Sequence, residues 1–244
     1  VDDIRAKDWN VTARMGEPYV KTYREERDLS VFLVVDISPS LFFGTREKAK
    51  REVVAEVGAL LALSAIHNND NVGLILFSDG VEKYIPPKKS VKHVIRIIRD
   101  LLVYEPKKKG SSLDSALAFF NTIRKRPCVC FVLSDFLQEP CDKTLAMVSR
   151  RHDLIGVAVN DIREHAIPDV GIITLCDSET GEHRAFDTSD ARVRADFKKR
   201  FSSCRRLWKK AMGKAVADII TIDTQEQPYE ALHRYFKRRK EVVR

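Results

Sequence analysis

The sequence predicts a doubly wound α/β domain, with a mainly parallel central sheet flanked by helices. Short apolar runs rich in β-branched residues alternate with amphipathic helical stretches along most of the chain. Several of these runs are apolar at nearly every position, as strands buried on both faces are. The chain has 244 residues, a length that can bury a sizeable core without disulfides or a structural metal.

Each expected strand is a short apolar run with turn residues or a helical stretch on either side. Such runs occur at residues 30–36, 72–77, 128–133, 154–159 and 219–222. Stretches with the periodicity of amphipathic helices lie at residues 46–68, 91–103, 113–124, 144–150 and 189–214. The pair Asp79-Gly80 is a strong hairpin signal and predicts an antiparallel strand over residues 81–85.

Two parts of the chain lie outside this alternation. Residues 1–29 contain an alternating run from Tyr19 to Tyr23 that predicts an antiparallel strand, so we expect these residues to form an N-terminal extension packed on the core. Residues 30–244 are expected to form one domain. A hairpin insertion is predicted near residues 170–187, with its turn at Glu179-Thr180-Gly181-Glu182.

Composition excludes several classes of protein. Hydrophobic residues make up 44% of the chain and charged residues 32%, which excludes a disordered chain and a membrane-embedded one. No apolar stretch is long enough to be an integral membrane segment, although an unseen leader or anchor stays open because the chain begins at Val1. The five cysteines show no metal-ligand spacing, so we expect free thiols and a cytoplasmic location.

The segment from Val34 to Ser40 is the most informative one for function. An apolar strand ends in Asp36, and Ser38 and Ser40 follow at steps of two. In an open parallel sheet, ligands bind at the carboxyl ends of the strands. Two other loops are expected at the same edge, one carrying Gly110-Ser111-Ser112 before a helix and one carrying Ser134-Asp135 after a strand.

Hydroxyl and carboxylate oxygens gathered at one point suit a hard divalent cation. Asp36, Ser38, Ser40, Ser111 and Asp135 are therefore predicted to form an oxygen-only site for Mg²⁺ or Mn²⁺. If the direct ligands are neutral hydroxyls, the ion keeps most of its charge and attracts a further carboxylate from a partner. A serine-rich turn without metal is the alternative interpretation of the Asp-x-Ser-x-Ser motif taken alone.

These residues resemble the metal-ion-dependent adhesion site (MIDAS) of von Willebrand factor A domains, which have a Rossmann-like fold. More specifically, the chain resembles the bacterial domain-of-unknown-function family fifty-eight, whose members carry such a domain. The segments that carry the resemblance outside the metal loops are Asp8-Trp9-Asn10-Val11-Thr12-Ala13-Arg14, Glu25-Glu26-Arg27-Asp28-Leu29, Asn68-Asn69-Asp70-Asn71-Val72-Gly73-Leu74 and Pro168-Asp169-Val170-Gly171. The resemblance covers nearly the whole chain.

The resemblance implies roles for the site residues and a partner for the protein. Ser38, Ser40 and Ser111 would bind the ion directly, while Asp36 and Asp135 would act through water or long contacts. The implied function is a non-enzymatic, metal-dependent interaction module, an adaptor or co-chaperone for a MoxR-type AAA+ ATPase. Two departures from the usual motif are Pro39 in place of glycine and Ser111 in place of threonine, and neither removes a ligand.

Two other functions were weighed against this one. A phosphatase with Asp36 as nucleophile needs a second carboxylate two residues later, where this chain has Ser38. A nucleic-acid-binding protein would account for the net charge of 43 − 35 = +8, but no recognition motif combines aromatic and basic residues. The basic run Lys107 to Lys109 directly precedes Ser111, so we expect it to favour an acidic partner at the metal site.

Overall fold

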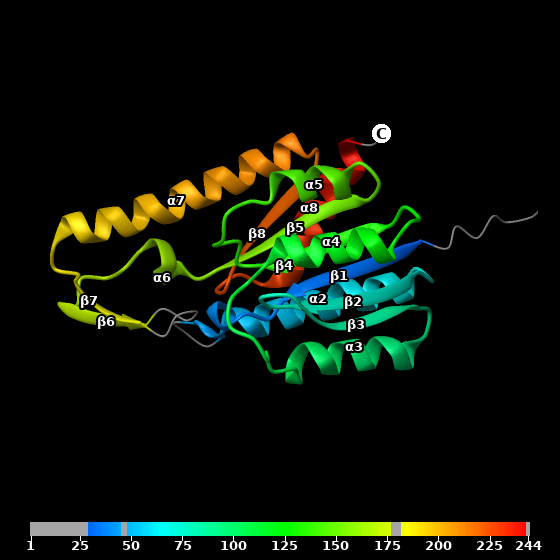
Figure 1. Ribbon diagram of the computed structural model, residues 1–244, viewed down its shortest axis with the longest axis horizontal. Coiled ribbons are helices and arrows are strands. Elements are labelled where there is room, and N and C mark those ends of the chain that lie inside the picture. The colour runs from blue at the N-terminus through cyan, green and yellow to red at the C-terminus, as the bar shows by residue number, and fades with distance from the viewer. Residues whose placement is uncertain (1–28, 45–47, 177–181, 243–244) are drawn as a thin grey trace, which may run out of the picture.

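The central sheet has six strands in the order β3-β2-β1-β4-β5-β8 (Figure 1). The computed structural model describes residues 29–44, 48–176 and 182–242. Five of the strands are parallel, and only β3 at one edge is antiparallel to its neighbour. The bounds are Ser30–Asp36 for β1, Asn71–Phe77 for β2, Val81–Lys88 for β3, Val129–Ser134 for β4, Asp153–Asn160 for β5 and Asp218–Asp223 for β8.

Helices cover both faces of this sheet, because successive residues of each strand point to opposite sides. Leu33 and Val35 of β1 belong to a core shared with one helical layer, whereas Phe32 and Val34 belong to a second core on the other face. The first layer consists of α2 (Lys50–His67), α3 (Val91–Val103) and α8 (Pro228–Val242). The second consists of α4 (Leu113–Ile123), α5 (Asp142–Ser149) and α7 (Ala191–Lys214).

Smaller elements follow the strands. A short 3-10 helix, η2 (Pro39–Phe42), follows β1, and the four-residue helix α6 (Ile162–His165) follows β5. A separate two-stranded antiparallel sheet is formed by β6 (Ile172–Cys176) and β7 (His183–Asp187). In Figure 1 this pair, α6 and the start of α7 project beyond the central sheet.

The reversal of strand order lies between β1 and β4. The chain proceeds from β1 to β2 on one side and later places β4 on the other side, and in open α/β sheets ligands bind at the carboxyl ends of strands at such a reversal. Val35 of β1 is in register with Leu133 of β4, so the next residues, Asp36 and Ser134, lie beside each other at this edge. The topology therefore brings together two of the three loops that sequence patterns singled out.

The doubly wound fold, the five predicted parallel strands and the antiparallel hairpin after Asp79-Gly80 are confirmed, although β8 at the sheet edge is partly exposed. The insertion near residues 170–187 is the β6–β7 pair. Helices α6 and α8 were not predicted from the sequence. The strand expected from Tyr19 to Tyr23, and with it the N-terminal extension, lies outside the described residues.

Candidate metal centre

Asp36 is the centre of the polar cluster at the carboxyl edge of the sheet. It is the last residue of β1, and only 1% of its surface is exposed. Its Oδ1 accepts the backbone N–H of Ser38 at 2.8 Å. Its Oδ2 accepts the hydroxyls of Ser111 at 2.9 Å and Ser134 at 2.8 Å. The carboxylate of Asp36 thus links three parts of the chain: the loop after β1, the end of β4 and the loop between α3 and α4.

The two serines of the first loop are held by the start of η2. Ser38 is fully buried, and its Oγ lies 3.0 Å from the Oγ of Ser40. Pro39 occupies the first helical position, where its missing N–H is not needed and its fixed φ suits the turn. Proline in place of glycine is therefore compatible with both hydroxyls lying on the same side of the loop as Asp36.

The loop that carries Ser111 is fixed by backbone contacts to the β2–β3 hairpin. The N–H of Ser112 donates to the carbonyl of Ser78 at 2.7 Å. The carboxylate of Glu82 accepts the N–H groups of Lys107 at 2.9 Å and Lys108 at 3.3 Å, and the hydroxyl of Ser78 as well. Partial burial alone would raise the pKa of Glu82, but these hydrogen bonds outweigh it and hold the pKa below its usual value.

Asp135 lies at the same edge but is held by a cation. Its Oδ2 accepts from Nζ of Lys50 at 2.8 Å, and its Oδ1 accepts the N–H of Leu137 at 3.4 Å. The same ammonium contacts Oε1 of Glu164 at 2.5 Å. Burial lowers the pKa of Lys50, but the two carboxylates more than offset this and raise it, so the amine is charged.

The charge of Asp36 is balanced less well. Burial, and then the nearby charge of Asp135, raise the pKa of Asp36 from 3.8 to about 6. Hydrogen bonds from Ser38 and Ser134 counter this only in part. In the described part of the chain, the groups that donate to Asp36 are all neutral. A cation at this position would remove the cost of ionising a buried carboxylate.

The donor set fits a hard divalent ion. Ser38, Ser40, Ser111 and Asp36 form one hydrogen-bonded cluster of oxygen atoms, and Asp135 is close enough to interact with Asp36 through its charge. Among the described residues, no group of three or more His, Cys, Asp or Glu side chains could hold a metal ion. The oxygen atoms gathered at this edge are mostly hydroxyls, from Ser38, Ser40 and Ser111.

Three residues of the site were not singled out by sequence reasoning. Ser134 directly precedes Asp135, and the sequence pattern predicts only Asp135 as a site residue. Lys50 and Glu164 lie on helices, where one charged residue among many carries no signal. Lys50 contacts Asp135, which is 85 residues away in the chain, and Glu164, which is 114 residues away. Only the folded sheet brings these residues together.

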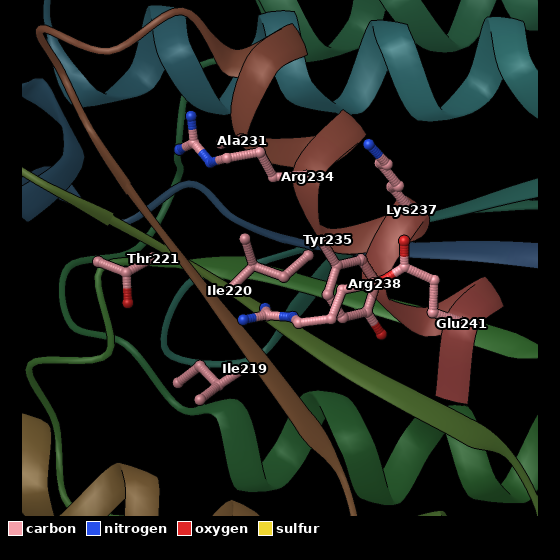
Figure 2. A pocket seen from close by; sticks show the side chains of 9 residues that line it. All are labelled: Ile219, Ile220, Thr221, Ala231, Arg234, Tyr235, Lys237, Arg238 and Glu241. Atoms are coloured by element: carbon pink, nitrogen blue, oxygen red, sulfur yellow. The ribbon is translucent and has the colours of Figure 1, made fainter. Parts of the chain in front are cut away.

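A cavity of about 520 Å³ lies elsewhere, between β8 and α8 (Figure 2). Three cationic side chains line it, together with apolar and hydroxyl-bearing residues of the strand and the helix. These cationic residues are Arg234, Lys237 and Arg238. None of the predicted metal-site residues lines this cavity, so it is not part of the candidate metal centre.

The cysteines differ in burial. None of the five forms a disulfide, and the most buried ones, Cys128 and Cys130, belong to the core around α4, α5 and α7. Burial raises the pKa of Cys128 to about 11, although Nδ1 of His152 lies 3.3 Å from its sulfur. Cys128 and Cys130 are thus small buried thiols, whereas Cys141 and Cys204 are partly buried and Cys176 is exposed.

Solved structures share this fold at low sequence identity. BatB, a conserved hypothetical protein from Bacteroides thetaiotaomicron, aligns over 88% of this chain and all of its own, with a TM-score of 0.56 and 12% identity. An aerotolerance-related membrane protein from Bacteroides fragilis aligns over 75% of this chain and 98% of its own, with a TM-score of 0.51 and 16% identity. The arrangement is that of the von Willebrand factor A fold.

Curated relatives come from mycobacteria. The uncharacterized protein Rv1480 of Mycobacterium tuberculosis is 30% identical over 200 residues, which is 80% of this chain and 62% of that protein. The chain thus spans less than two thirds of the length of such relatives. Within the described residues, no helix is both long and apolar enough to cross a bilayer. Residues 1–206 match the family described as "Protein of unknown function DUF58", and the chain belongs to that family.

Proposed function

We propose that this chain is a non-enzymatic protein-interaction module that depends on a divalent metal ion, Mg²⁺ or Mn²⁺. Ser38, Ser40 and Ser111 would bind the ion directly, and Asp36 and Asp135 would act through water or long contacts. The observation that carries the proposal is the state of Asp36, a buried carboxylate whose described hydrogen-bond donors are all neutral. A bound cation supplies the missing charge.

The chemistry of the donor set supports partner binding rather than hydrolysis. Neutral hydroxyls leave most of the positive charge on the ion, which then attracts an acidic side chain from another protein. Apolar side chains at the same edge suit such a contact. Phe42 at the end of η2, Phe43 directly after it and Leu137 after Asp135 are each 42–50% exposed. Exposed apolar groups around a charged centre are typical of interaction surfaces.

Family resemblance suggests the partner. The resemblance to domain-of-unknown-function family fifty-eight implies a MoxR-type AAA+ ATPase, so we propose a cytoplasmic adaptor or co-chaperone of such an ATPase. The metal edge, which we define as the candidate metal residues Asp36, Ser38, Ser40, Ser111 and Asp135, is the surface that would receive an acidic side chain of the ATPase.

The two alternatives lack supporting observations. A phosphatase would need an acid next to Asp36, but Ser38 is fully buried and uses its N–H to bind Asp36 and its Oγ to contact Ser40. A nucleic-acid-binding protein would need aromatic platforms beside its cations. On the basic helix α7, the largest aromatic side chain, Trp208, is fully buried and donates to the carbonyl of Gln138.

A metal titration tests the centre itself. We expect Mn²⁺ to bind the wild type saturably at one site by calorimetry, and the D36A/S38A variant to lose this binding. The matched control is D196A/S202A, which removes the same two kinds of group from the exposed face of α7. A D36A/S38A variant that binds Mn²⁺ as well as the wild type does contradicts the metal centre.

A second experiment tests the partner. The purified MoxR-type ATPase of the same organism, with Mg²⁺ and nucleotide, is expected to co-purify with the wild type. Chelation with EDTA and the D36A/S38A variant should each abolish capture, whereas D196A/S202A should not. Capture that survives both chelation and D36A/S38A would mean that the contact is made by another surface.

A further inference from the structure

Lys50 is a fully buried cation with no role in the proposed metal chemistry. It is the first residue of α2, and its side chain has 0% exposure. Lysine is rarely buried completely, and a positive charge at a helix N-terminus opposes the helix dipole. Its backbone N–H donates to the carbonyl of Phe43 at 3.0 Å, which fixes the start of α2 beside the first metal loop. Two unfavourable placements of one charge imply that a specific partner requires it.

The partners of Lys50 are two carboxylates from different elements. Its Nζ lies 2.8 Å from Oδ2 of Asp135, after β4, and 2.5 Å from Oε1 of Glu164, in α6. Glu164 is oriented in turn, because its Oε2 accepts the N–H of Asp161 at 3.0 Å in a capping box. The ammonium is therefore held in a fixed position by groups that are themselves fixed.

Of the two carboxylates at the carboxyl edge of the sheet, Asp135 is the one that is paired with the ammonium of Lys50. Oδ2 of Asp135 faces Lys50, and Oδ1 accepts the N–H of Leu137. Asp36, in contrast, has only neutral donors among the described residues. The edge thus contains one carboxylate neutralised from within and one that is not.

We propose that Lys50 is the resident counter-ion of Asp135, and that it weakens the binding of a free divalent ion at this edge until a partner's carboxylate joins the site. This inference rests on the proposed metal centre and adds its regulation. The ammonium keeps Asp135 from approaching the ion closely, and its charge repels the ion across a buried, weakly screened space. An acidic partner restores the missing negative charge, so ion and partner bind together.

The test compares Mn²⁺ binding by the wild type with binding by K50M/E164Q, which removes the ammonium and the second carboxylate without changing the net charge. We expect this variant to bind Mn²⁺ at least tenfold more tightly by calorimetry, a change of about 1.4 kcal/mol. The Mn²⁺-induced rise in melting temperature should increase in parallel. K50Q, which replaces the ammonium with an uncharged amide that has two N–H donors, should change binding in the same direction if K50M/E164Q does not fold.

The matched control is K48M/E56Q. Lys48 lies two residues before Lys50 and also pairs with a glutamate, at 2.8 Å, but both side chains are partly exposed. This control should bind Mn²⁺ as the wild type does. Equal tightening in the control would show that any nearby charge has the effect and would overturn the proposal.

The remaining outcomes separate this inference from the proposed function. Equal Mn²⁺ affinity in the wild type and K50M/E164Q overturns the role of Lys50 and leaves the metal centre standing. Binding by the variant alone supports both. Absence of binding by both folded proteins overturns both.

Discussion

Ser111 and Asp36 are 75 residues apart in the chain, yet the hydroxyl of Ser111 donates to Oδ2 of Asp36 at 2.9 Å. The contact joins the loop before α4 to the end of the central strand β1. Because backbone hydrogen bonds to Ser78 and Glu82 also hold that loop, the hydroxyl is positioned by the fold. A site whose ligands are held in place by rigid elements loses little conformational entropy when it binds an ion.

Ser134 donates a hydrogen bond to Asp36, and loss of its hydroxyl should destabilise the domain. Its hydroxyl donates to Oδ2 of Asp36 and accepts the N–H of Phe136 at 3.1 Å, and the residue is fully buried. Ser134→Ala leaves both groups short of a partner, so we expect a loss of about 1–3 kcal/mol in the free energy of unfolding. Urea denaturation measures this. Ser202→Ala, on the exposed face of α7, should stay within about 0.5 kcal/mol of the wild type.

Stability without metal should depend on pH through Asp36. Its pKa is 3.8 when unperturbed and about 6 in the fold, so the folded protein binds the proton more tightly than the unfolded chain. The associated stability is fully present below about pH 4 and is lost as the pH rises to about 6, a change of about 2–3 kcal/mol. Asp36→Asn should lack this decline.

The measurement is the free energy of unfolding at several pH values between 4 and 7 in the presence of EDTA, for wild type and Asp36→Asn. Saturating Mn²⁺ should oppose the decline, because the ion favours the ionised carboxylate. A wild-type profile parallel to that of Asp36→Asn would show that Asp36 does not titrate in this range.

Sequence patterns predicted the sheet because strands buried on both faces have a simple signature. The run from Val31 to Val35 is apolar at every position, and the next residue is the carboxylate of the site. Knowing only that parallel strands share a carboxyl edge, one can place Asp36, Ser38 and Asp135 near one another. In the structure the N–H of Ser38 donates to Asp36, and Asp135 acts on Asp36 through its charge.

The parts that sequence patterns missed depend on contacts between distant residues. Helix α8 has few apolar residues, and it packs through Ala231, Leu232 and Tyr235 among many charges. On α7, the buried residues are Trp208, Ala211 and Met212, whereas the neighbouring Leu207 is 55% exposed. Lysine is typical of the surface, and Lys50 is buried only because Asp135 after β4 and Glu164 in α6 pack against it.

Glu82 should control metal affinity without touching the ion. It accepts the N–H groups of Lys107 and Lys108 and so fixes the loop that ends at Ser111. Glu82→Ala releases this loop, and we expect about tenfold weaker Mn²⁺ binding by calorimetry, as for other outer-shell residues of metal sites. Glu105→Ala removes an exposed carboxylate from the same loop and should leave the affinity unchanged. Equal affinities for both variants would mean that Ser111 does not depend on Glu82.

The lysines of this loop should act on the partner instead. Lys107, Lys108 and Lys109 are exposed directly before the metal loop. Replacing all three with glutamine keeps their N–H groups, so Mn²⁺ affinity should not fall. Binding to an acidic MoxR-type ATPase should weaken at low ionic strength and lose most of its salt dependence. The matched control neutralises Lys198, Lys199 and Arg200 on α7, and a loss of binding of the same size there would point to net charge rather than this loop.

Substitution of Gly110 can distinguish an effect on stability from an effect on Mn²⁺ affinity, because Gly110 has a positive φ and directly precedes Ser111. Its φ is +97°, which a residue with a Cβ rarely adopts. Gly110→Ala should cost about 1–3 kcal/mol of stability and shift the Ser111 hydroxyl, weakening Mn²⁺ binding. Gly171 has a φ of +78° before β6, away from the metal loops, with open space around an added Cβ. Gly171→Ala should therefore lose similar stability but bind Mn²⁺ as the wild type does. Similar Mn²⁺ affinity in both variants would show that the geometry of the Ser111 loop does not determine how the ion is held.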